Sequence, residues 1–563
     1  MAGAEIAPND AAKQPDIDAL KLAEMGYKQD MKRNFSLWSV LGVAFSLTNS
    51  WFGVSASMVT GINSGGPVLL VYGILLIALI TSCAAVSLSE LASSMPSAGG
   101  QYFWANELAP SRYANLAGYL TGCFAWVGSI FTTSSVALAM ATAVTGLYQL
   151  THESFEVQAW HVIVAYQALN AVSFLFNIYG KVLPTIATAT LYISLLSFAI
   201  ILITVPSFAP NHNSSKFVFA TFINNTGWHN DGIAFLIGLM NPEWAFACLD
   251  CATHMAEEVP EPEKTIPLAI CSTVAIGFCT AWPFAIGMMF SIQDLTSVTF
   301  TPTGVPIIEI FHQSTNVIGA CALETLVILT GTGCLIACHT WQSRLCWSFA
   351  RDAGLPGHRW LKQVHPRLEV PLMAHLFSCT LVALVGFLYW ASTAAFSSTV
   401  TACIVLLYVS YSVPVISLLV RGRSNIRHGP FWLGDKLGLV ANCLLLAWTL
   451  FIIVIYSFPT TMPTSGRSMN YVSVLYIALA AVMLFDWSVR ARWEFRGHLE
   501  RKLDAAAGGR GHGGEREVVA VTGNSDAAGR TSSVGGMLGE RGGGHGGDGS
   551  VGVGNDNRTE ERA

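Results

Sequence analysis

The sequence predicts an all-α polytopic membrane protein with about twelve transmembrane helices. Hydrophobic residues make up 52% of the 563-residue chain and charged residues only 12%, a balance that an ordinary water-soluble domain does not show. Two stretches, 36–89 and 370–420, contain no Asp, Glu, Lys or Arg, and each is long enough for two spans of about 20 residues. The apolar runs lack the alternation of a membrane β-strand, so helices are the expected element.

The spans are placed from the hydrophobic runs and from the polar, Gly or Pro segments that interrupt them. A helix rises about 1.5 Å per residue, so a run of about 20 residues crosses the hydrocarbon layer once. On this basis we expect, in chain order, helices at 36–63, 66–91, 113–149, 158–179, 182–206, 231–256, 267–290, 315–347, 371–391, 396–420, 437–458 and 470–490.

The two ends of the chain differ from this twelve-helix domain, which we expect at 35–493. Segment 1–34 mixes lysines with acidic and polar residues and has no apolar core of a cleaved signal peptide, so the first span drives insertion. Segment 494–563 becomes rich in glycine with scattered charges, and it cannot bury enough apolar surface to offset the entropy of ordering. We expect a cytosolic N-terminal segment and a disordered cytosolic tail.

The orientation follows from the distribution of Lys and Arg. Basic residues cluster after the eighth, tenth and twelfth spans, which predicts that these loops and both termini lie in the cytosol. Two sequons, beginning at Asn213 and Asn224, fall in the loop after the fifth span, which is then outside. We therefore expect glycosylation at Asn213 and Asn224.

Two spans carry residues that weaken a helix. Span one contains segment 51–57 (WFGVSAS), in which Gly53 permits close backbone approach, and span six contains segment 241–246 (NPEWAF), in which Pro242 removes a helical hydrogen bond. These spans are five apart, as a repeat of five helices requires. Broken helices in matching positions line the solute site of inverted-repeat transporters, so we expect repeats at about 36–206 and 231–420, with extra helices at 437–490.

Few ionisable residues remain inside the spans. A charge at the centre of a membrane helix costs roughly 2.5–3.5 kcal/mol, so each one needs a partner or a function. Asp250 lies in span six beyond the expected break, and it is the expected source of negative charge near a solute. The gate or coupling candidates are Glu90, Glu243, Glu258 and Glu324.

Aromatic side chains accompany this negative charge. An aromatic face attracts cations, most strongly a quaternary ammonium group that has no hydrogen to donate. The combination favours a small cationic solute. The expected substrate-binding residues are Trp51, Phe52, Gly53, Ser55, Tyr119, Trp126, Trp244, Phe246, Asp250 and Tyr411.

Several longer motifs extend these patterns. They are 35–38 (FSLW), 48–53 (TNSWFG), 90–91 (EL) with 96–102 (PSAGGQY), 250–259 (DCATHMAEEV) with 262–267 (PEKTIP), 337–342 (ACHTWQ), 350–356 (ARDAGLP) and 428–434 (HGPFWLG). In these motifs the chain resembles the amino acid–polyamine–organocation superfamily, specifically its fungal amino acid/choline permeases. The resemblance covers about residues 28 to 493.

The resemblance implies a five-plus-five inverted-repeat fold, alternating access, and plasma-membrane uptake of choline or a related small cation between spans one, three, six, eight and ten. It implies that Trp244 is the gating aromatic and that Asp250 occupies the place of an acidic residue in bacterial members. A proton is a possible co-substrate, although span five lacks the lysine of several proton-coupled members. The alternatives are a γ-aminobutyrate, other amino acid or polyamine permease, and a nutrient sensor.

An enzyme is not expected. The sequence contains no Walker-type glycine loop, no HExxH motif and no other recognisable catalytic set. We expect no metal, no cofactor and no nucleic-acid partner, and we expect the lipid bilayer and a small solute as the partners.

Overall fold

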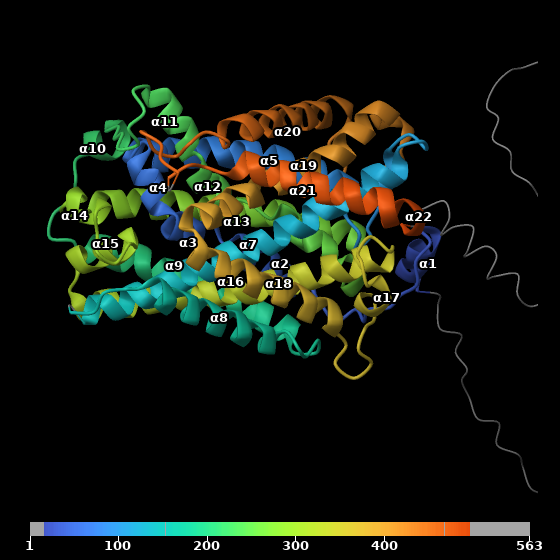
Figure 1. Cartoon of the computed structure of the whole chain (residues 1–563), viewed down its shortest axis with the longest axis horizontal. Coiled ribbons are helices and arrows are strands. Elements are labelled where there is room, and N and C mark those ends of the chain that lie inside the picture. Colours follow the sequence, from blue (N-terminus) through green and yellow to red (C-terminus); the bar gives the residue numbers. More distant parts are fainter. Residues whose placement is uncertain (1–15, 153, 467, 496–563) are drawn as a thin grey trace, which may run out of the picture. The chain divides into compact units, whose positions relative to one another are not determined.

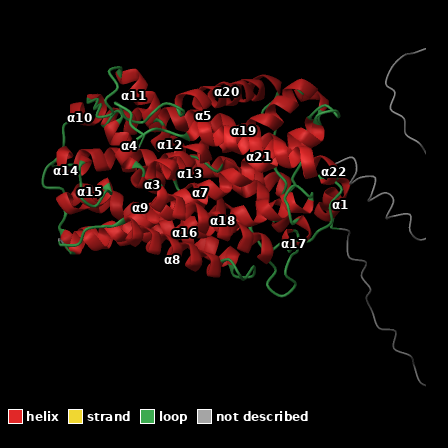
Figure 2. Ribbon diagram, viewed as in Figure 1, coloured by secondary structure: helices red, strands yellow, loops and turns green. Residues whose placement is uncertain are grey.

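The computed structural model describes residues 16–152, 154–466 and 468–495. The described residues form helices joined by loops, with no strand among them (Figure 2). Twelve helical stretches in this part of the chain are long and apolar enough to cross a membrane. The predicted all-α polytopic fold is confirmed. The glycine-rich tail expected from residue 494 lies almost wholly outside the described residues, as do residues 1–15.

The observed spans agree with the expected ones to within a few residues at most ends. Spans one to six are α2–α3 (Leu37–Thr48 and Ser50–Ala56), η1–α5 (Leu69–Gly73 and Ile74–Ser94), α7 (Ala114–Thr151), α8 (Ala159–Phe176), α9 (Leu183–Phe208) and α11–α12–η2 (Asp231–Gly238, Met240–Ala245 and Leu249–Glu258). Spans seven to twelve are α13 (Pro262–Ser291), α16 (Val317–Arg351), α18 (Leu372–Ala391), α19 (Thr393–Arg421), α20 (Asp435–Ile455) and α21–η4–α22 (Val472–Asp486, Trp487–Ala491 and Arg492–Glu494).

Short helices connect the spans and gather at the two ends of the bundle. They are α1 (Ile17–Glu24), α4 (Met58–Asn63), α6 (Gln101–Leu108), α10 (Ser215–Ala220), α14 (Leu295–Thr299), α15 (Pro306–Ser314), α17 (His358–Leu361) and η3 (Arg423–Asn425). Figure 1 shows α10, α14 and α15 at one end, and α1, α17 and α22 at the other. We call these the α10 end and the α1 end. The first and last described helices therefore lie at the same end.

Burial separates central spans from peripheral ones. In span one, 89% of the most apolar window is buried by other helices, whereas in span twelve only 11% is. α3 packs against α12 and α13, and α7 packs against α16 and α19. Figure 1 shows α20 along one edge of the bundle and α8 along the opposite edge. The interrupted spans one and six thus lie in the interior, where irregular backbone is shielded from lipid.

Candidate functional site

Spans one and six are both interrupted at a residue with left-handed backbone. α2 ends at Thr48, Asn49 adopts φ 33°, and α3 begins at Ser50. α12 ends at Ala245, and Cys248, with φ 68°, precedes the 3-10 segment η2. Neither residue is glycine, so each break holds a conformation that most side chains avoid.

The larger breaks only partly coincide with the expected segments. α11 ends at Gly238 and α12 begins at Met240, and Pro242 has no N–H to donate to the carbonyl of Gly238 four residues earlier, so the expected interruption at Pro242 is the short one at Leu239. The larger break in span six follows at 246–248. In span one, most of the expected segment 51–57 is the helix α3, and the main break is at Asn49.

The two spans touch beyond their breaks. A Cβ added at Gly53 would lie 2.6 Å from Ala245 Cα, so only glycine permits this approach. The side chain of Asn241 donates to Ser57 Oγ at 2.6 Å, and Ser57 Oγ donates to the carbonyl of Gly53 at 2.8 Å. Ser55 Oγ donates to the carbonyl of Phe52. The contact between the spans is therefore made by neutral groups.

A cavity of ≈ 200 Å³ lies next to this contact, among spans one, three, six and ten. Its walls follow the break in span one and precede the break in span six, so it lies on the α10 side of both. No lining side chain is ionisable. The lining residues are Ala56, Ser57, Thr60, Ser135, Leu138, Ala139, Thr142, Met240, Asn241, Trp244 and Val400.

Of the expected aromatic residues, Trp244 lines this cavity. Its Nε1 donates to Ser135 Oγ of α7 at 3.0 Å, which holds the indole across the gap between spans six and three. Trp51 is directed away, because its Nε1 donates to Ser194 Oγ of α9 and its ring packs against Phe284 of α13.

The other expected aromatic residues also lie elsewhere. Trp126 stacks on Phe377 of α18, and the Tyr119 hydroxyl donates to Asp486 near the α1 end. Phe246 contacts the position of Gly277 on α13, and the Phe52 ring lies against Gly331 of α16. The described conformation does not bring these residues and Trp244 into one aromatic cage.

Asp250 is completely buried and does not line the cavity. The Tyr411 hydroxyl donates to Oδ1 at 2.6 Å, and Gln101 Nε2 donates to Oδ2 at 2.7 Å. His254 Nε2 lies 3.1 Å from the same Oδ2. Both carboxyl oxygens are therefore engaged by protein groups, and a solute in the cavity has no direct access to them in this conformation.

The remaining buried acids of the spans differ in their partners. Trp448 Nε1 on α20 lies 3.1 Å from both carboxyl oxygens of Glu243. Among the described residues, no lysine or arginine forms an ion pair with this carboxyl group. Glu324 on α16 is fully buried, and within the described part of the chain neither of its oxygens has a hydrogen-bond partner. Neither residue lines the cavity.

Buried ion pairs close the α1 end. Glu258 accepts two bonds from Arg344, at 2.9 and 3.3 Å, and Glu257 accepts two from Arg351, at 2.9 and 2.8 Å. These pairs tie the end of span six to α16. Glu90 at the end of α5 pairs with Arg423 at 2.9 Å. The bidentate pairs of Arg344 and Arg351 fix geometry as well as charge, so they hold span six to span eight, and the Glu90–Arg423 pair separately holds span two to η3 after span ten.

The N-terminal segment covers these pairs. The Tyr27 hydroxyl donates to Asp352 at 2.8 Å, and the guanidinium of Arg351 lies 3.9 Å from the Tyr27 ring centroid. Lys21 pairs with Glu263 at 2.6 Å. The described conformation is thus closed at the α1 end, and its cavity lies toward the other end.

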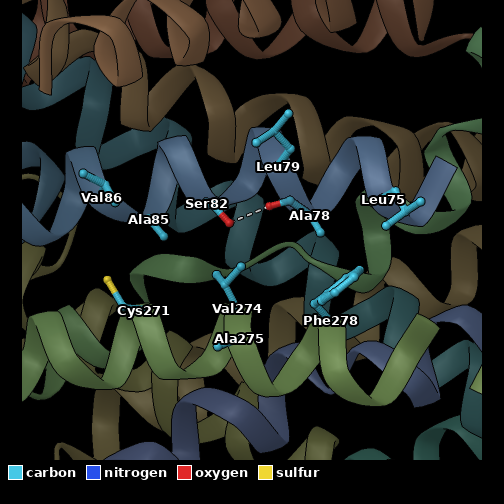
Figure 3. Close-up of a pocket in the computed structure, with 10 residues that line it drawn as sticks. All are labelled: Leu75, Ala78, Leu79, Ser82, Ala85, Val86, Cys271, Val274, Ala275 and Phe278. Carbon is cyan, nitrogen blue, oxygen red and sulfur yellow. Dashed lines mark hydrogen bonds between the residues drawn. The ribbon is translucent and has the colours of Figure 1, made fainter. Parts of the chain in front are cut away.

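A larger cavity, of ≈ 360 Å³, lies between α5 and α13 (Figure 3). Apolar side chains dominate its lining, and the Ser82 hydroxyl donates a hydrogen bond to the carbonyl of Ala78 at 2.7 Å. Nothing in this groove is placed to recognise a polar or charged solute. We therefore assign the candidate site to the cavity beside Trp244.

The two sequon asparagines lie in loops at the α10 end, on either side of α10. The Asn213 amide nitrogen donates to the carbonyls of Met289 and Ile292, and that of Asn224 donates to Trp228 and Asp231. Glycosylation at both positions stays a prediction.

Sequence analysis did not identify the polar lining of the cavity or the partners of Asp250. Ser135 and Thr142 are seven residues apart on α7 and so lie on one helix face, but many such pairs occur in this chain. Gln101 and His254 lie within motifs that carried the family resemblance, yet their spacing gives no sign that they meet at Asp250.

Comparison with known proteins agrees with this architecture. The family described as "Amino acid permease" matches residues 35–480. The "Choline transporter" of Saccharomyces cerevisiae is 51% identical over 506 residues, which cover 89% of this chain and 88% of the relative. The "7-keto 8-aminopelargonic acid transporter" of the same yeast is 34% identical, covering 80% and 91%. The "Transmembrane transporter swnT" of Metarhizium robertsii is 34% identical, covering 87% and 98%.

Proposed function

The chain belongs to the amino acid permease family, and we propose that it takes up choline or a closely related small organic cation across the plasma membrane. The observation that carries the proposal is the 51% identity, across nearly the full length of both chains, to a relative named for choline. The protein is a multi-pass membrane protein and not an enzyme, since the family and these relatives are transporters.

The chemistry of the cavity supports a quaternary ammonium solute. Such a head group has no N–H to donate, so it gains little from carboxylates at hydrogen-bond distance and more from an aromatic face and neutral oxygens. Trp244 supplies the face, and Ser57, Ser135 and Thr142 supply hydroxyls that suit the alcohol of choline. The proposed site is therefore this cavity, with Asp250 acting on the solute only through the groups around it.

We further propose that the α1 end is cytosolic and that the described conformation faces outward. The Lys- and Arg-rich loops support this orientation. The ion pairs of Glu257 and Glu258 would then form the closed inner gate, which must open in the second half of an alternating-access cycle. One positive charge moving inward through 100 mV gains about 2.3 kcal/mol, enough for roughly fifty-fold accumulation.

A zwitterionic substrate is the second candidate, because a relative at 34% identity is named for an acid rather than a cation. Its carboxylate would need donors at the cavity. The N-terminal ends of α3 and η2, which have no side-chain cap, lie at the breaks instead, and no basic side chain lines the cavity. The cation is therefore the better fit.

The test is radiolabelled choline uptake in choline-transport-deficient cells that express the chain. We expect saturable uptake that quaternary amines block and γ-aminobutyrate does not. Trp244→Leu should raise the KM for choline about tenfold, since a desolvated cation–π contact contributes about 1–2 kcal/mol. Trp126→Leu, at matched surface expression, is the control and should leave KM unchanged.

Two results would count against the proposal in different ways. No choline uptake by surface-expressed protein would remove choline as the substrate. Normal uptake with an unchanged KM in Trp244→Leu would keep the function and move the site away from this cavity.

A further inference from the structure

Two threonines in the lining of the cavity beside Trp244 have unused hydrogen-bonding capacity, Thr60 on α4 and Thr142 on α7. We infer that these threonines bind the alcohol of the solute and make the protein selective for quaternary ammonium alcohols over quaternary ammonium carboxylates. The inference rests on the proposed uptake of choline through this cavity, and it adds the residues that determine specificity.

The two serines of the lining already act as both donors and acceptors. A hydroxyl group has one hydrogen to donate. The hydrogen of Ser135 goes to a carbonyl of its own helix at 2.8 Å, and its oxygen accepts from Trp244 Nε1. The hydrogen of Ser57 goes to a carbonyl of its own span at 2.8 Å, and its oxygen accepts from Asn241 at 2.6 Å. Neither serine has a hydrogen left for a solute.

The same contacts fix the orientation of the Asn241 amide. Its nitrogen faces the carbonyl of Val54 at 3.4 Å as well as Ser57 Oγ, and a carbonyl only accepts, so the N–H groups lie on this side. The amide oxygen is buried and has no hydrogen-bond partner among the residues that the structure describes. Asn241 therefore adds an acceptor to this region and no spare side-chain donor.

The two threonines differ from these residues. The Thr142 hydroxyl donates to the carbonyl of Ala139 at 2.8 Å, and within the described part of the chain no group donates to its oxygen, so its lone pairs are available. The Thr60 side chain is half-buried, and its hydroxyl has no hydrogen-bond partner in the described structure. Thr60 can therefore both donate to a solute and accept from it.

The positions of these groups also orient the solute. Trp244 donates to Ser135, and Thr142 lies seven residues further along α7, about 10 Å toward the α10 end. Thr60 lies on α4, which Figure 1 shows near the same end. The ammonium head can therefore lie against the indole while the alcohol reaches the two threonines.

This arrangement favours an alcohol over a carboxylate. The alcohol donates its hydrogen to Thr142 Oγ1 and accepts from Thr60 Oγ1, so each partner is satisfied. A carboxylate only accepts, and in this lining it would meet one free side-chain donor, the Thr60 hydroxyl, beside the lone pairs of Thr142. Because a buried acceptor without a donor is costly, the carboxylate should bind far more weakly.

The first test compares inhibitors of radiolabelled choline uptake by the wild-type chain. Ethyltrimethylammonium keeps the charged head but lacks the alcohol, and glycine betaine carries a carboxylate in its place. We expect the inhibition constant to exceed the KM for choline about tenfold for ethyltrimethylammonium and at least about a hundredfold for betaine. If either compound inhibits with a constant equal to the KM for choline, the inference is overturned and choline uptake stands.

The second test uses Thr142→Val and Thr60→Val, which remove a hydroxyl and nearly keep the shape of the side chain. Each should raise the KM for choline about tenfold and leave the inhibition constant of ethyltrimethylammonium unchanged, because that solute has no alcohol to lose. Thr142→Ser keeps the hydroxyl and should stay close to the wild type.

Thr145→Val is the matched control. Thr145 also lies on α7 and donates to a carbonyl of its own helix at 2.9 Å, but it does not line the cavity, so both constants should stay unchanged. A loss of affinity in Thr142→Val that is equal for choline and ethyltrimethylammonium would reflect a change in cavity shape and would overturn the inference. Absence of choline uptake by surface-expressed wild-type protein would instead overturn the proposed function, and the inference with it.

Discussion

The two broken helices solve the same backbone problem with different chemistry. Each breaks at one left-handed, non-glycine residue, Asn49 in span one and Cys248 in span six. Around the first break the described contacts are neutral, and the Asn49 side chain accepts from Ser194 Oγ at 3.1 Å. Around the second, Glu243 lies three residues before the break segment, and the Asp250–His254 pair follows it.

This difference separates two roles that a transporter needs. Span one supplies close backbone packing and neutral polar groups, so it can line a path for the solute without placing a charge there. Span six supplies the ionisable groups, and each of them is held by a partner on another span: Glu243 by α20, Asp250 by α19 and Glu258 by α16. Motion of span six must therefore exchange these contacts, whereas motion of span one need not.

The largest expected effect comes from the packing role of span one. Gly53→Leu places a Cβ 2.6 Å from Ala245 Cα, which is backbone and cannot rotate away. Overpacking of this kind costs about 1–3 kcal/mol or more and forces spans one and six apart. We expect loss of choline uptake by at least about a hundredfold, measured by radiolabelled flux at matched surface expression.

Gly466→Leu is the control for this change. A Cβ there meets nothing closer than the Tyr471 hydroxyl at 3.8 Å, so uptake should stay normal. Near-normal uptake in Gly53→Leu would show that the close approach of the two spans is not required.

A smaller effect is expected at Glu243, on the charged side of the comparison. Glu243→Leu leaves the Trp448 N–H without its acceptor inside the bundle, which costs about 1–3 kcal/mol. Glu243→Gln keeps a carbonyl oxygen for that donor and should retain most of the stability. The measurement is the thermal unfolding of purified protein in detergent.

Trp448→Phe provides the second arm of a double-mutant cycle. Since it removes the donor, Glu243→Leu should cost less in that background. Equal losses in both backgrounds would mean that Glu243 is stabilised by something other than Trp448.

The sequence predicted the spans far better than the site, and the reason is physical. Span seven was expected at 267–290 and is observed at Pro262–Ser291, because hydrocarbon demands long apolar helices wherever they lie in the fold. The break in span six was expected at Pro242, which accounts for the short interruption at Leu239, whereas the larger break follows at 246–248. The residue type at position 248 gives no signal in the sequence that the backbone of Cys248 will adopt φ 68°.

The aromatic cage shows the same limit for side chains. Trp51 and Trp244 lie next to corresponding breaks, yet the first faces α9 and α13 and the second faces the cavity. Rotation of a helix by one residue turns a side chain by about 100°, and that rotation is set by packing that no local pattern encodes. The acidic residues could be predicted from the sequence because charge in a membrane is rare. Their hydrogen-bond partners could not be predicted.

The smallest expected effect compares the two breaks directly. Glycine is favoured over alanine by about 1 kcal/mol where the backbone is left-handed, the reverse of its order inside a helix. Cys248→Gly should therefore unfold at a higher temperature than Cys248→Ala and at least match the wild type. At Asn49 the wild type should exceed both variants, because asparagine tolerates this backbone and its side chain accepts from Ser194.

Ala234→Gly, in the regular helix α11, calibrates the comparison and should lower stability by about 0.5–1 kcal/mol. If Cys248→Gly proves less stable than Cys248→Ala, the side chain at 248 does more than occupy the break. If Asn49→Gly matches the wild type, the bond to Ser194 adds nothing, and the neutral break of span one is held by its backbone alone. The two breaks would then differ only in the ionisable groups around span six.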